Sequence, residues 1–326
     1  MLRDNYGRHI HDLRIAVTDR CNYRCFYCMS ADPVVYSNGE PVTLDDFCRL
    51  VRIFASLGIS KVRVTGGEPL LRRGIEGFIA RLSAIAGLRD RALTTNGWLL
   101  ADKAKALAEA GLTRLNISMD SVNREKLVRI TRTDAYHHVL RGIEAAQEAG
   151  LHPVKVNVVL VRGLNDDEVV DFATFARERR VVVRFIEFMP LDADRNWTRD
   201  LVVTAREVIE KISAVYPLTP AGRETKHSTA DKYLFADGAG EIGVVAAVSM
   251  PFCGSCSRIR LTADGRIRTC LFSLWDHDIK PLLRAGASDE QIADFIRRVT
   301  LLKEERHHIS DPDFVKPART MVFIGG

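Results

Sequence analysis

A regular alternation of short β-rich runs and longer amphipathic stretches over residues 13–188 most constrains the fold of this chain. The amphipathic stretches space their apolar residues as helices do, and four of them end at a glycine. Strands that alternate with helices at roughly thirty-residue spacing form right-handed βαβ units and a parallel sheet. We therefore predict strands at residues 13–18, 61–65, 91–95, 114–118, 154–160 and 181–188, and helices at residues 44–57, 75–85, 102–110, 136–149 and 167–179.

Six strand–helix units are too few to close an eight-stranded barrel, so the predicted fold is α/β, with an open, partial (βα)6 barrel of the TIM-like kind. The alternation then stops. A helix is predicted at residues 204–214, and after a turn-rich segment two β-rich runs follow at residues 241–249 and 258–272, the second a hairpin. We expect a partial-barrel domain at residues 1–200 and a C-terminal α+β domain at residues 201–326.

Composition and charge exclude several classes of protein. The 326 residues contain no run of about 18 apolar residues and no basic-then-apolar leader, so we expect neither a membrane span nor secretion. The net charge of +5 is small and its Lys and Arg residues are scattered, which argues against nucleic acid and suits an anionic small substrate. Seven cysteines without a leader indicate a reducing compartment, so we expect a cytoplasmic protein whose thiols serve metals or catalysis.

Six of the seven cysteines fall into two tight groups, and the seventh, Cys48, lies at helical spacing among apolar residues as a core residue would. Thiolates favour zinc or iron–sulfur clusters. A structural zinc wants four ligands, whereas a four-iron cluster held by three cysteines leaves one iron open to a small molecule. In the second group His277 is the nearest fourth ligand for zinc, so zinc stays an alternative there. The groups are Cys21, Cys25 and Cys28 (C-x3-C-x2-C), and Cys253, Cys256 and Cys270 (C-x2-C-x13-C).

The unusual stretches of the first half all lie at the carboxyl ends of predicted strands. The first cysteine group follows the first strand, and the later strands end at "TGGEP" (65–69), "TTNG" (94–97), "SMD" (118–120) and "EFMP" (187–190). In βα barrels the active site is built at this rim. The sequence therefore predicts an enzyme active site there.

The C-x3-C-x2-C spacing, with Tyr27 before the last cysteine and "GGEP" on the next strand, resembles the radical S-adenosylmethionine (SAM) superfamily. The resemblance implies a 4Fe–4S cluster whose open iron binds SAM and whose electron breaks the sulfonium bond to give a 5′-deoxyadenosyl radical. Cofactors of this kind perform the radical chemistry, and the protein binds them and excludes water. The residues that would contact SAM are Tyr27, Gly66, Gly67, Glu68, Ser118 and Met189.

The second cysteine group narrows the resemblance to the GTP 3′,8-cyclase family of molybdenum-cofactor biosynthesis. The similarity includes "VRVTGGEPLLR", "LTTNG", "VKVNVV", "VRFIEFMP" and the final "FIGG". It implies a second 4Fe–4S cluster whose open iron binds the guanine of GTP. It also implies a source of electrons and delivery of the product to cyclic pyranopterin monophosphate synthase, and it leaves a homodimer open. The loop after Cys28 departs from the family, because it is short and carries Ser30 in place of proline.

A triphosphate needs forked guanidinium donors and point charges. Arg258 and Arg260 alternate along one strand, so both face one side. The resemblance assigns GTP binding to Arg14, Lys61, Arg63, Thr94, Lys155, Arg184, Arg258, Ile259 and Arg260, and catalytic roles to Arg258, Arg260, Gly325 and Gly326.

Two other functions remain in play at this point. A peptide-modifying radical SAM maturase with an auxiliary cluster would share both cysteine groups, although such enzymes usually carry more cysteines and do not need the strand-end arginines. A metal-binding module without catalysis would not explain features gathered at one rim. The sequence favours the cyclase.

Overall fold

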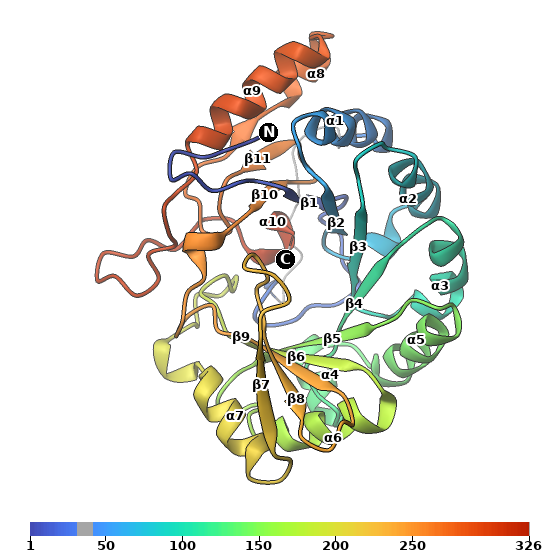
Figure 1. The fold of residues 1–326 in the computed structure, drawn as a ribbon, viewed down its shortest axis with the longest axis vertical. Helices are drawn as coiled ribbons and strands as arrows, with labels where there is room; N and C mark the ends of the chain where they lie inside the picture. The colour runs from blue at the N-terminus through green and yellow to red at the C-terminus, as the bar shows by residue number, and fades with distance from the viewer. Residues whose placement is uncertain (31–41, 326) are drawn as a thin grey trace.

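The computed structural model describes residues 1–30 and 42–325, and within them twelve strands form a single sheet (Figure 1). Six neighbouring strands of this sheet follow chain order, and every adjacent pair is parallel. Their bounds lie within two residues of the prediction, which is confirmed. These strands are β1 (Asp12–Ala16), β2 (Lys61–Thr65), β3 (Asp90–Thr95), β4 (Arg114–Ser118), β5 (Val154–Leu160) and β6 (Val182–Glu187).

The predicted helices cover the outside of this curved sheet, as Figure 1 shows. They are α1 (Leu44–Ser56), α2 (Ile75–Ser83), α3 (Leu100–Glu109), α5 (Tyr136–Glu148) and α6 (Val169–Arg179). Helix α1 begins at a capping box, in which Thr43 and Asp46 satisfy each other's free backbone N–H groups. One further helix, α4 (Arg124–Thr131), was not predicted, because it buries too few residues to show an apolar period.

Strands from the last third of the chain extend this sheet at both of its edges. Beside β1 lies the parallel strand β10 (Arg258–Leu261), followed by the antiparallel strands β11 (Arg266–Arg268) and β12 (His277–Asp278). Beside β6 lies the parallel strand β9 (Glu241–Val245), followed by the antiparallel strands β8 (Asp231–Phe235) and β7 (Leu218–Gly222).

Eight parallel strands therefore lie side by side, yet the sheet does not close, because antiparallel strands occupy the outer edges of β10 and β9. This confirms the open, partial barrel. Two expectations were wrong in detail. The turn-rich segment after residue 217 contains two strands, and residues 277–278, where no strand was predicted, form β12. The sheet is continuous across residue 200, so the domain division there stays a prediction.

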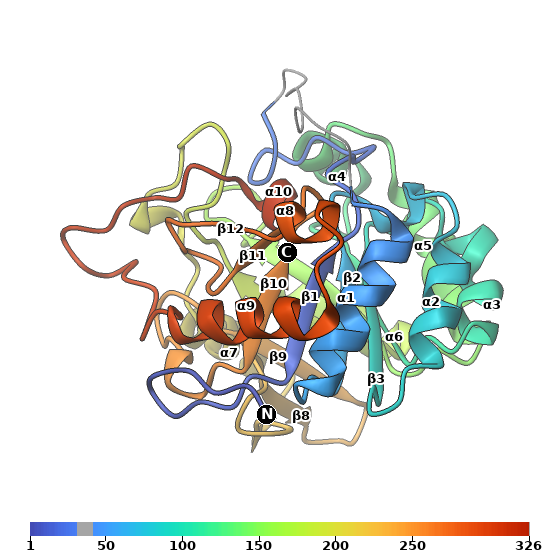
Figure 2. The same ribbon diagram turned by 90° about the horizontal axis from the view of Figure 1, so that it is seen from above.

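The remaining helices belong to the C-terminal part of the chain. The predicted helix at residues 204–214 is α7 (Ala205–Ser213), whereas α8 (Lys280–Arg284) and α9 (Asp289–Leu301) were not predicted. Figure 2 shows α9 beside α1, where Arg49 pairs with Asp289 at 2.8 Å. The last helix, α10 (Met321–Ile324), lies within the ring of strands in Figure 1. Within the part of the chain described, every helix is too short or too polar to cross a bilayer.

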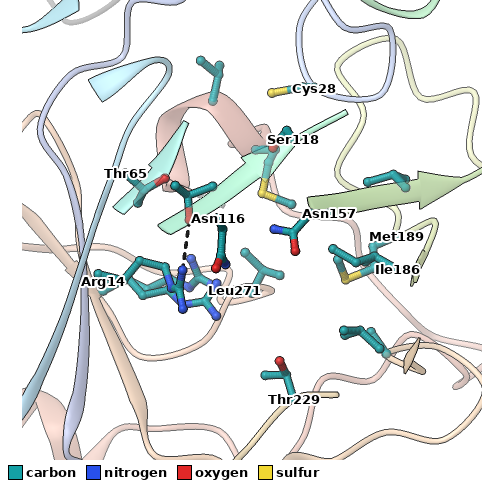
Figure 3. A pocket seen from close by; sticks show the side chains of 18 of the residues that line it. Arg14, Cys28, Thr65, Asn116, Ser118, Asn157, Ile186, Met189, Thr229 and Leu271 are labelled. Carbon is teal, nitrogen blue, oxygen red and sulfur yellow. Dashed lines mark hydrogen bonds between the residues drawn. The ribbon is translucent and has the colours of Figure 1, made fainter. Parts of the chain in front are cut away.

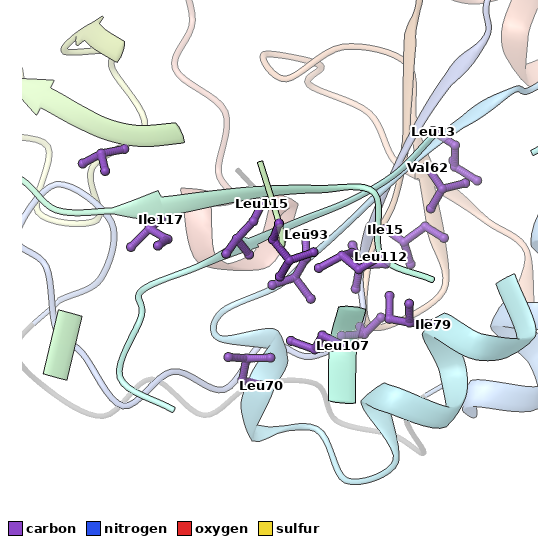
Figure 4. Packing of buried hydrophobic residues seen from close by; sticks show 14 of the residues in the cluster. Leu13, Ile15, Val62, Leu70, Ile79, Leu93, Leu107, Leu112, Leu115 and Ile117 are labelled. Atoms are coloured by element: carbon purple, nitrogen blue, oxygen red, sulfur yellow. The ribbon is translucent and has the colours of Figure 1, made fainter. Parts of the chain in front are cut away.

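The hydrophobic core lies between the sheet and its outer helices, as the packing around Leu93, Leu107 and Leu115 shows (Figure 4). Strand β5 shows how side chains divide between the two faces. Val154, Val156 and Val158 are fully buried toward the helices, while Lys155 and Asn157 alternate with them and face the interior. Charged and polar side chains of the strands therefore point into the barrel interior, and the main apolar core lies outside it.

We expect Leu93→Ala to lower the free energy of unfolding by about 2–5 kcal/mol, because the fully buried leucine of β3 leaves a cavity between the sheet and its helices. Urea unfolding of the two proteins under identical conditions measures the difference. Leu302→Ala is the control, since that leucine is 61% exposed and its loss should change stability by less than about 0.5 kcal/mol. Equal effects of the two changes would contradict this account of the core.

Candidate active site

A cavity of roughly 290 Å³ lies inside the ring of strands, and both cysteine groups border it. Much of the remaining lining comes from the parallel strands and the loops at their carboxyl ends, where the active site was predicted, and the rest comes from α10 and other segments of the last third of the chain. Figure 3 shows Ser118 of β4, Asn157 of β5 and Met189 from the loop after β6 facing this space. Of the predicted site residues, the following line the cavity: Arg14, Cys21, Cys25, Tyr27, Cys28, Arg63, Gly66, Gly67, Glu68, Thr94, Ser118, Arg184, Met189, Cys253, Cys256, Arg258, Arg260 and Cys270.

The first cysteine group lies on the loop that follows β1. Backbone N–H groups of Cys28 and Met29 both donate to the carbonyl of Cys25 at 2.9 Å, which folds the loop into a turn. The amide of Tyr23 donates to Cys21 Sγ at 3.4 Å. Burial raises the pKa of the Cys21 thiol to about 11 and raises those of the other two thiols further. A positively charged group bound beside these thiols would favour their deprotonated form.

The thiols of each group border the cavity and do not converge on a position for one metal ion. Across residues 1–30 and 42–325, no three His, Cys, Asp or Glu side chains are gathered closely enough to hold one metal ion. Three soft thiol ligands around a cavity fit a larger iron–sulfur group, whose ligands are thiolates of this kind. The cysteines present therefore suit the group that the sequence predicts.

The glycines of the "TGGEP" stretch bring two loops into backbone contact. A Cβ on Gly66 would lie 2.5 Å from the carbonyl oxygen of Thr18, and one on Gly67 would lie 2.2 Å from that of Arg20. The N–H groups of Gly67 and Glu68 donate to these same carbonyls at 2.7 Å. The glycines are thus needed to hold the cysteine loop against β2, a role within the chain that the sequence did not indicate.

Glu68 is a buried carboxylate that organises the same corner of the cavity. Its oxygens accept from the Thr95 hydroxyl and the Asn96 N–H, both at 2.7 Å, and from the Leu70 N–H at 2.9 Å. Burial raises its pKa to about 7, although these three donors favour the charged form. The carboxylate therefore ties the loops after β2 and β3 together at the cavity wall.

Tyr27 is held by an acid that the sequence did not single out. Its hydroxyl donates to Asp120 Oδ2 at 2.5 Å, and Asp120 Oδ1 accepts from the Val159 N–H at 2.8 Å. Asp120 is only 3% exposed, and burial raises its pKa to about 6. In the sequence, a role for Asp120 was indicated only by its place in the "SMD" stretch at the end of a strand.

Three arginines lie side by side on neighbouring strands. The register pairs Arg14 of β1 with Arg260 of β10 on one side and with Arg63 of β2 on the other. Burial and the charges of neighbouring arginines lower the pKa of Arg14 to about 9 and that of Arg63 to about 10. Among residues 1–30 and 42–325, the buried Nε atoms of Arg14, Arg63, Arg184 and Arg258 have no hydrogen-bond partner. An anion in the cavity would lie beside these guanidinium groups and offset their like charges.

Lys61 and Lys155 lie in a second recess of roughly 70 Å³, at the amino ends of the strands. Arg14, Arg63 and Arg184 border both spaces. Burial and the charge of Arg184 lower the pKa of Lys155 to about 8, even though Glu224 lies 3.9 Å away. The sequence missed the other cations of this recess, Arg114 and Lys232, because neither belongs to a motif.

The second cysteine group lies on both sides of the β10–β11 hairpin. Cys253 begins the short helix η3 (Cys253–Ser255), Cys256 precedes β10, and Cys270 follows β11. Burial by itself would raise the pKa of Cys256, but the charges of Arg258 and Lys303 outweigh it and lower the pKa to about 6.

Several residues around the second group differ from expectation. His277, considered as a fourth zinc ligand, is not among the cavity-lining residues and lies on β12 opposite Ile267. Ile259 points away from the cavity into the hydrophobic core. Lys303 and His307 line the cavity, although no sequence pattern indicated them.

The C-terminal tail enters the ring and meets one of the predicted catalytic arginines. Arg260 Nη1 donates to the carbonyl of Gly325. Gly325 has a φ of +76°, and a Cβ there would lie 2.9 Å from that of Ala16, so only glycine fits. Gly326, also predicted to act in catalysis, lies outside the described residues.

Comparison with known proteins agrees with this geometry. Residues 15–176 match the family described as the radical SAM superfamily, and residues 181–309 match the one described as Molybdenum Cofactor Synthesis C. The chain is 45% identical over its whole length to the GTP 3′,8-cyclase of Streptomyces coelicolor, covering 96% of that protein. It is 44% identical to that of Geobacter sulfurreducens, covering 99% of that protein.

Among solved structures, Streptococcus suis SuiB bound to S-adenosylmethionine superposes with a TM-score of 0.61. The match covers 89% of this chain and 66% of that one, at 13% sequence identity, and shows a shared fold alone. The full-length relatives are far more similar. With one cavity bordered by two cysteine groups and a row of arginines, the chain belongs to the GTP 3′,8-cyclase family of radical SAM enzymes.

Proposed function

We propose that this chain converts GTP to (8S)-3′,8-cyclo-7,8-dihydroguanosine 5′-triphosphate, the first step of molybdenum-cofactor biosynthesis, with SAM as the radical source. One observation carries the proposal. Both cysteine groups border the same cavity as the buried arginines whose Nε atoms have no partner. Full-length relatives that are 45% and 44% identical and are named GTP 3′,8-cyclase support it.

The SAM site is proposed beside the first cysteine group, where Tyr27, Ser118 and Met189 border the cavity. When bound, an iron–sulfur cluster with one open iron supplies the electron that cleaves SAM. The chain holds Tyr27 in place through Asp120 and keeps the cysteine loop against β2 through its paired glycines. Apolar atoms of α10 border the same cavity, which keeps water from a reactive radical.

The triphosphate of GTP is proposed to bind where the cavity meets the recess at the amino ends of the strands. Arg14, Arg63 and Arg184 border both spaces and would each gain a charge-assisted hydrogen bond from a phosphate. Lys61 and Lys155 add point charges from the recess. In this arrangement the guanine would reach the second cysteine group, which borders the same cavity.

The remaining parts of the proposal concern catalysis and partners. We infer a second 4Fe–4S cluster at Cys253, Cys256 and Cys270, and roles for Arg258, Arg260, Gly325 and Gly326 beside the reacting part of GTP. The contact between Arg260 and the Gly325 carbonyl supports this. The proposal also includes a separate electron donor and a downstream cyclic pyranopterin monophosphate synthase. A cytoplasmic location and a homodimer stay predictions.

The peptide-maturase alternative finds less support. A recess of roughly 70 Å³ bordered by seven Lys and Arg side chains, against three acidic ones, suits a compact polyanion better than an extended peptide. The likeness to SuiB is one of fold.

Reconstituted protein, reduced and kept free of oxygen, should form 5′-deoxyadenosine and the cyclic nucleotide from SAM and GTP. Mass spectrometry of the quenched reaction measures both products. Parallel reactions with SAM and a peptide, or with SAM alone, serve as controls. Modification of the peptide without conversion of GTP would replace the cyclase proposal with the maturase one.

Cys25→Ser should abolish 5′-deoxyadenosine formation, because the first cysteine group then has too few thiolates to hold its cluster. Chromatographic assay of 5′-deoxyadenosine measures the effect. Cys48→Ala is the matched control, since Cys48 is a buried residue of α1 that does not border the cavity. SAM cleavage at the parent rate by the Cys25 variant would refute the assignment.

Arg184→Met should weaken GTP binding by about 10- to 100-fold, the cost of one or two hydrogen bonds to a charged group. Its effect on guanosine should be small, because guanosine lacks the phosphates. Anaerobic calorimetry with both ligands measures the difference. Arg206→Met is the control, since that side chain is 84% exposed on α7. Equal losses for guanosine and GTP would place the phosphates elsewhere.

A further inference from the structure

The segment that follows α9 brings charged side chains to the second cysteine group. Lys303 is 4% exposed and borders the cavity together with Cys253, Cys256 and Cys270. Its Nζ donates to the carbonyl of Thr269, the residue that precedes Cys270. Lys303 thus reaches the cysteine group from a segment more than thirty residues away in sequence.

Lys303 is a buried cation without a carboxylate partner. Across the described residues, no acidic side chain lies within ion-pair distance of its Nζ. A buried ammonium is costly unless an opposite charge lies near it. The thiol groups around it would supply that charge once deprotonated.

Glu304, the next residue, also binds Thr269 and carries the opposite charge. Its Oε2 accepts from the hydroxyl of Thr269 at 2.7 Å, while Lys303 binds the Thr269 carbonyl. The charge of Glu304 acts on the Cys270 thiol in the sense opposite to that of Lys303. Arg8 fixes the same segment, because its Nη1 donates to the carbonyls of Glu305 at 2.6 Å and Cys253 at 2.9 Å. The two neighbouring charges are therefore held in defined places beside the cysteines.

We propose that Lys303 is a positioning residue for the second cysteine group, where it holds the Thr269–Cys270 backbone and raises the reduction potential of the iron–sulfur cluster. This rests on the proposed function, since that cluster is part of it. Nearby positive charge stabilises the more negative, reduced state of a cluster, and groups beyond the ligands commonly tune metal sites in this way. Glu304 should lower the potential by the same reasoning.

The test uses the full-length chain with Cys21, Cys25 and Cys28 all changed to Ala, so that only the second group can assemble. Lys303→Met and Glu304→Gln are each made in this background, and iron per chain and the midpoint potential are measured by spectroscopic redox titration. At a fixed applied potential, Lys303→Met should lower the ratio of reduced to oxidised cluster about tenfold, equivalent to about 59 mV for one electron. Glu304→Gln should raise that ratio.

The opposite signs separate charge from structure. Lys303→Met removes a charge and one hydrogen bond to Thr269, whereas Glu304→Gln removes a charge and keeps an oxygen that can accept from the Thr269 hydroxyl. A merely structural disturbance would not shift the potential in opposite directions. Shifts of the same sign, or none, with about four irons per chain would overturn the role of Lys303 and leave the second cluster standing. Absence of iron in the background protein would overturn the second cluster itself and this proposal with it.

If Lys303→Met fails to assemble its cluster, a variant that keeps the positive charge provides the test. Lys303→Arg should keep the iron and a potential near that of the background protein. That result, together with a raised potential in Glu304→Gln, would support the proposal. Loss of iron from Lys303→Arg and an unchanged potential in Glu304→Gln would refute it.

Discussion

The alternation of side chains along the parallel strands is the constraint on which the rest of this structure depends. On β1, Leu13 and Ile15 are fully buried toward the helices, while Arg14 between them faces the interior. The same alternation places Ile259 in the core and Arg258 and Arg260 at the cavity. A slip of one residue in register would exchange the two faces, burying arginines among leucines. Packing of the apolar face against the helices therefore determines which side chains of each strand point into the interior.

A consequence of this arrangement is a group of like charges held together away from water. Parallel pairing in register brings Arg260, Arg14 and Arg63 next to one another, and their mutual repulsion adds to the cost of burial. The core between the sheet and its helices must offset this cost in the absence of an anion. Binding a polyanion relieves it, so the same feature that strains the free protein favours the proposed substrate.

The two ends of the chain complete the cavity together. The segment after β1 carries the first cysteine group, and β10, which pairs with β1 itself, lies between Cys256 and Cys270 of the second. The tail then returns to the centre of the ring, where Gly325 contacts Arg260 and packs against Ala16. Contacts between the N-terminal and C-terminal parts of the chain thus keep both cysteine groups at the same cavity.

The sequence by itself determined the parallel sheet, most of its helices and the two cysteine spacings, because apolar periodicity and metal-ligand spacing are local properties. It also placed the unusual stretches at one rim, since parallel strands end at the same edge. Only the tertiary structure decided that the C-terminal strands extend both edges of the sheet, and that Lys61 and Lys155 lie in a separate recess. Asp120 and Lys303 were likewise found only there. Their roles depend on which distant segments pack together, and the register of long-range pairing and the burial of charge leave no periodic pattern in the sequence.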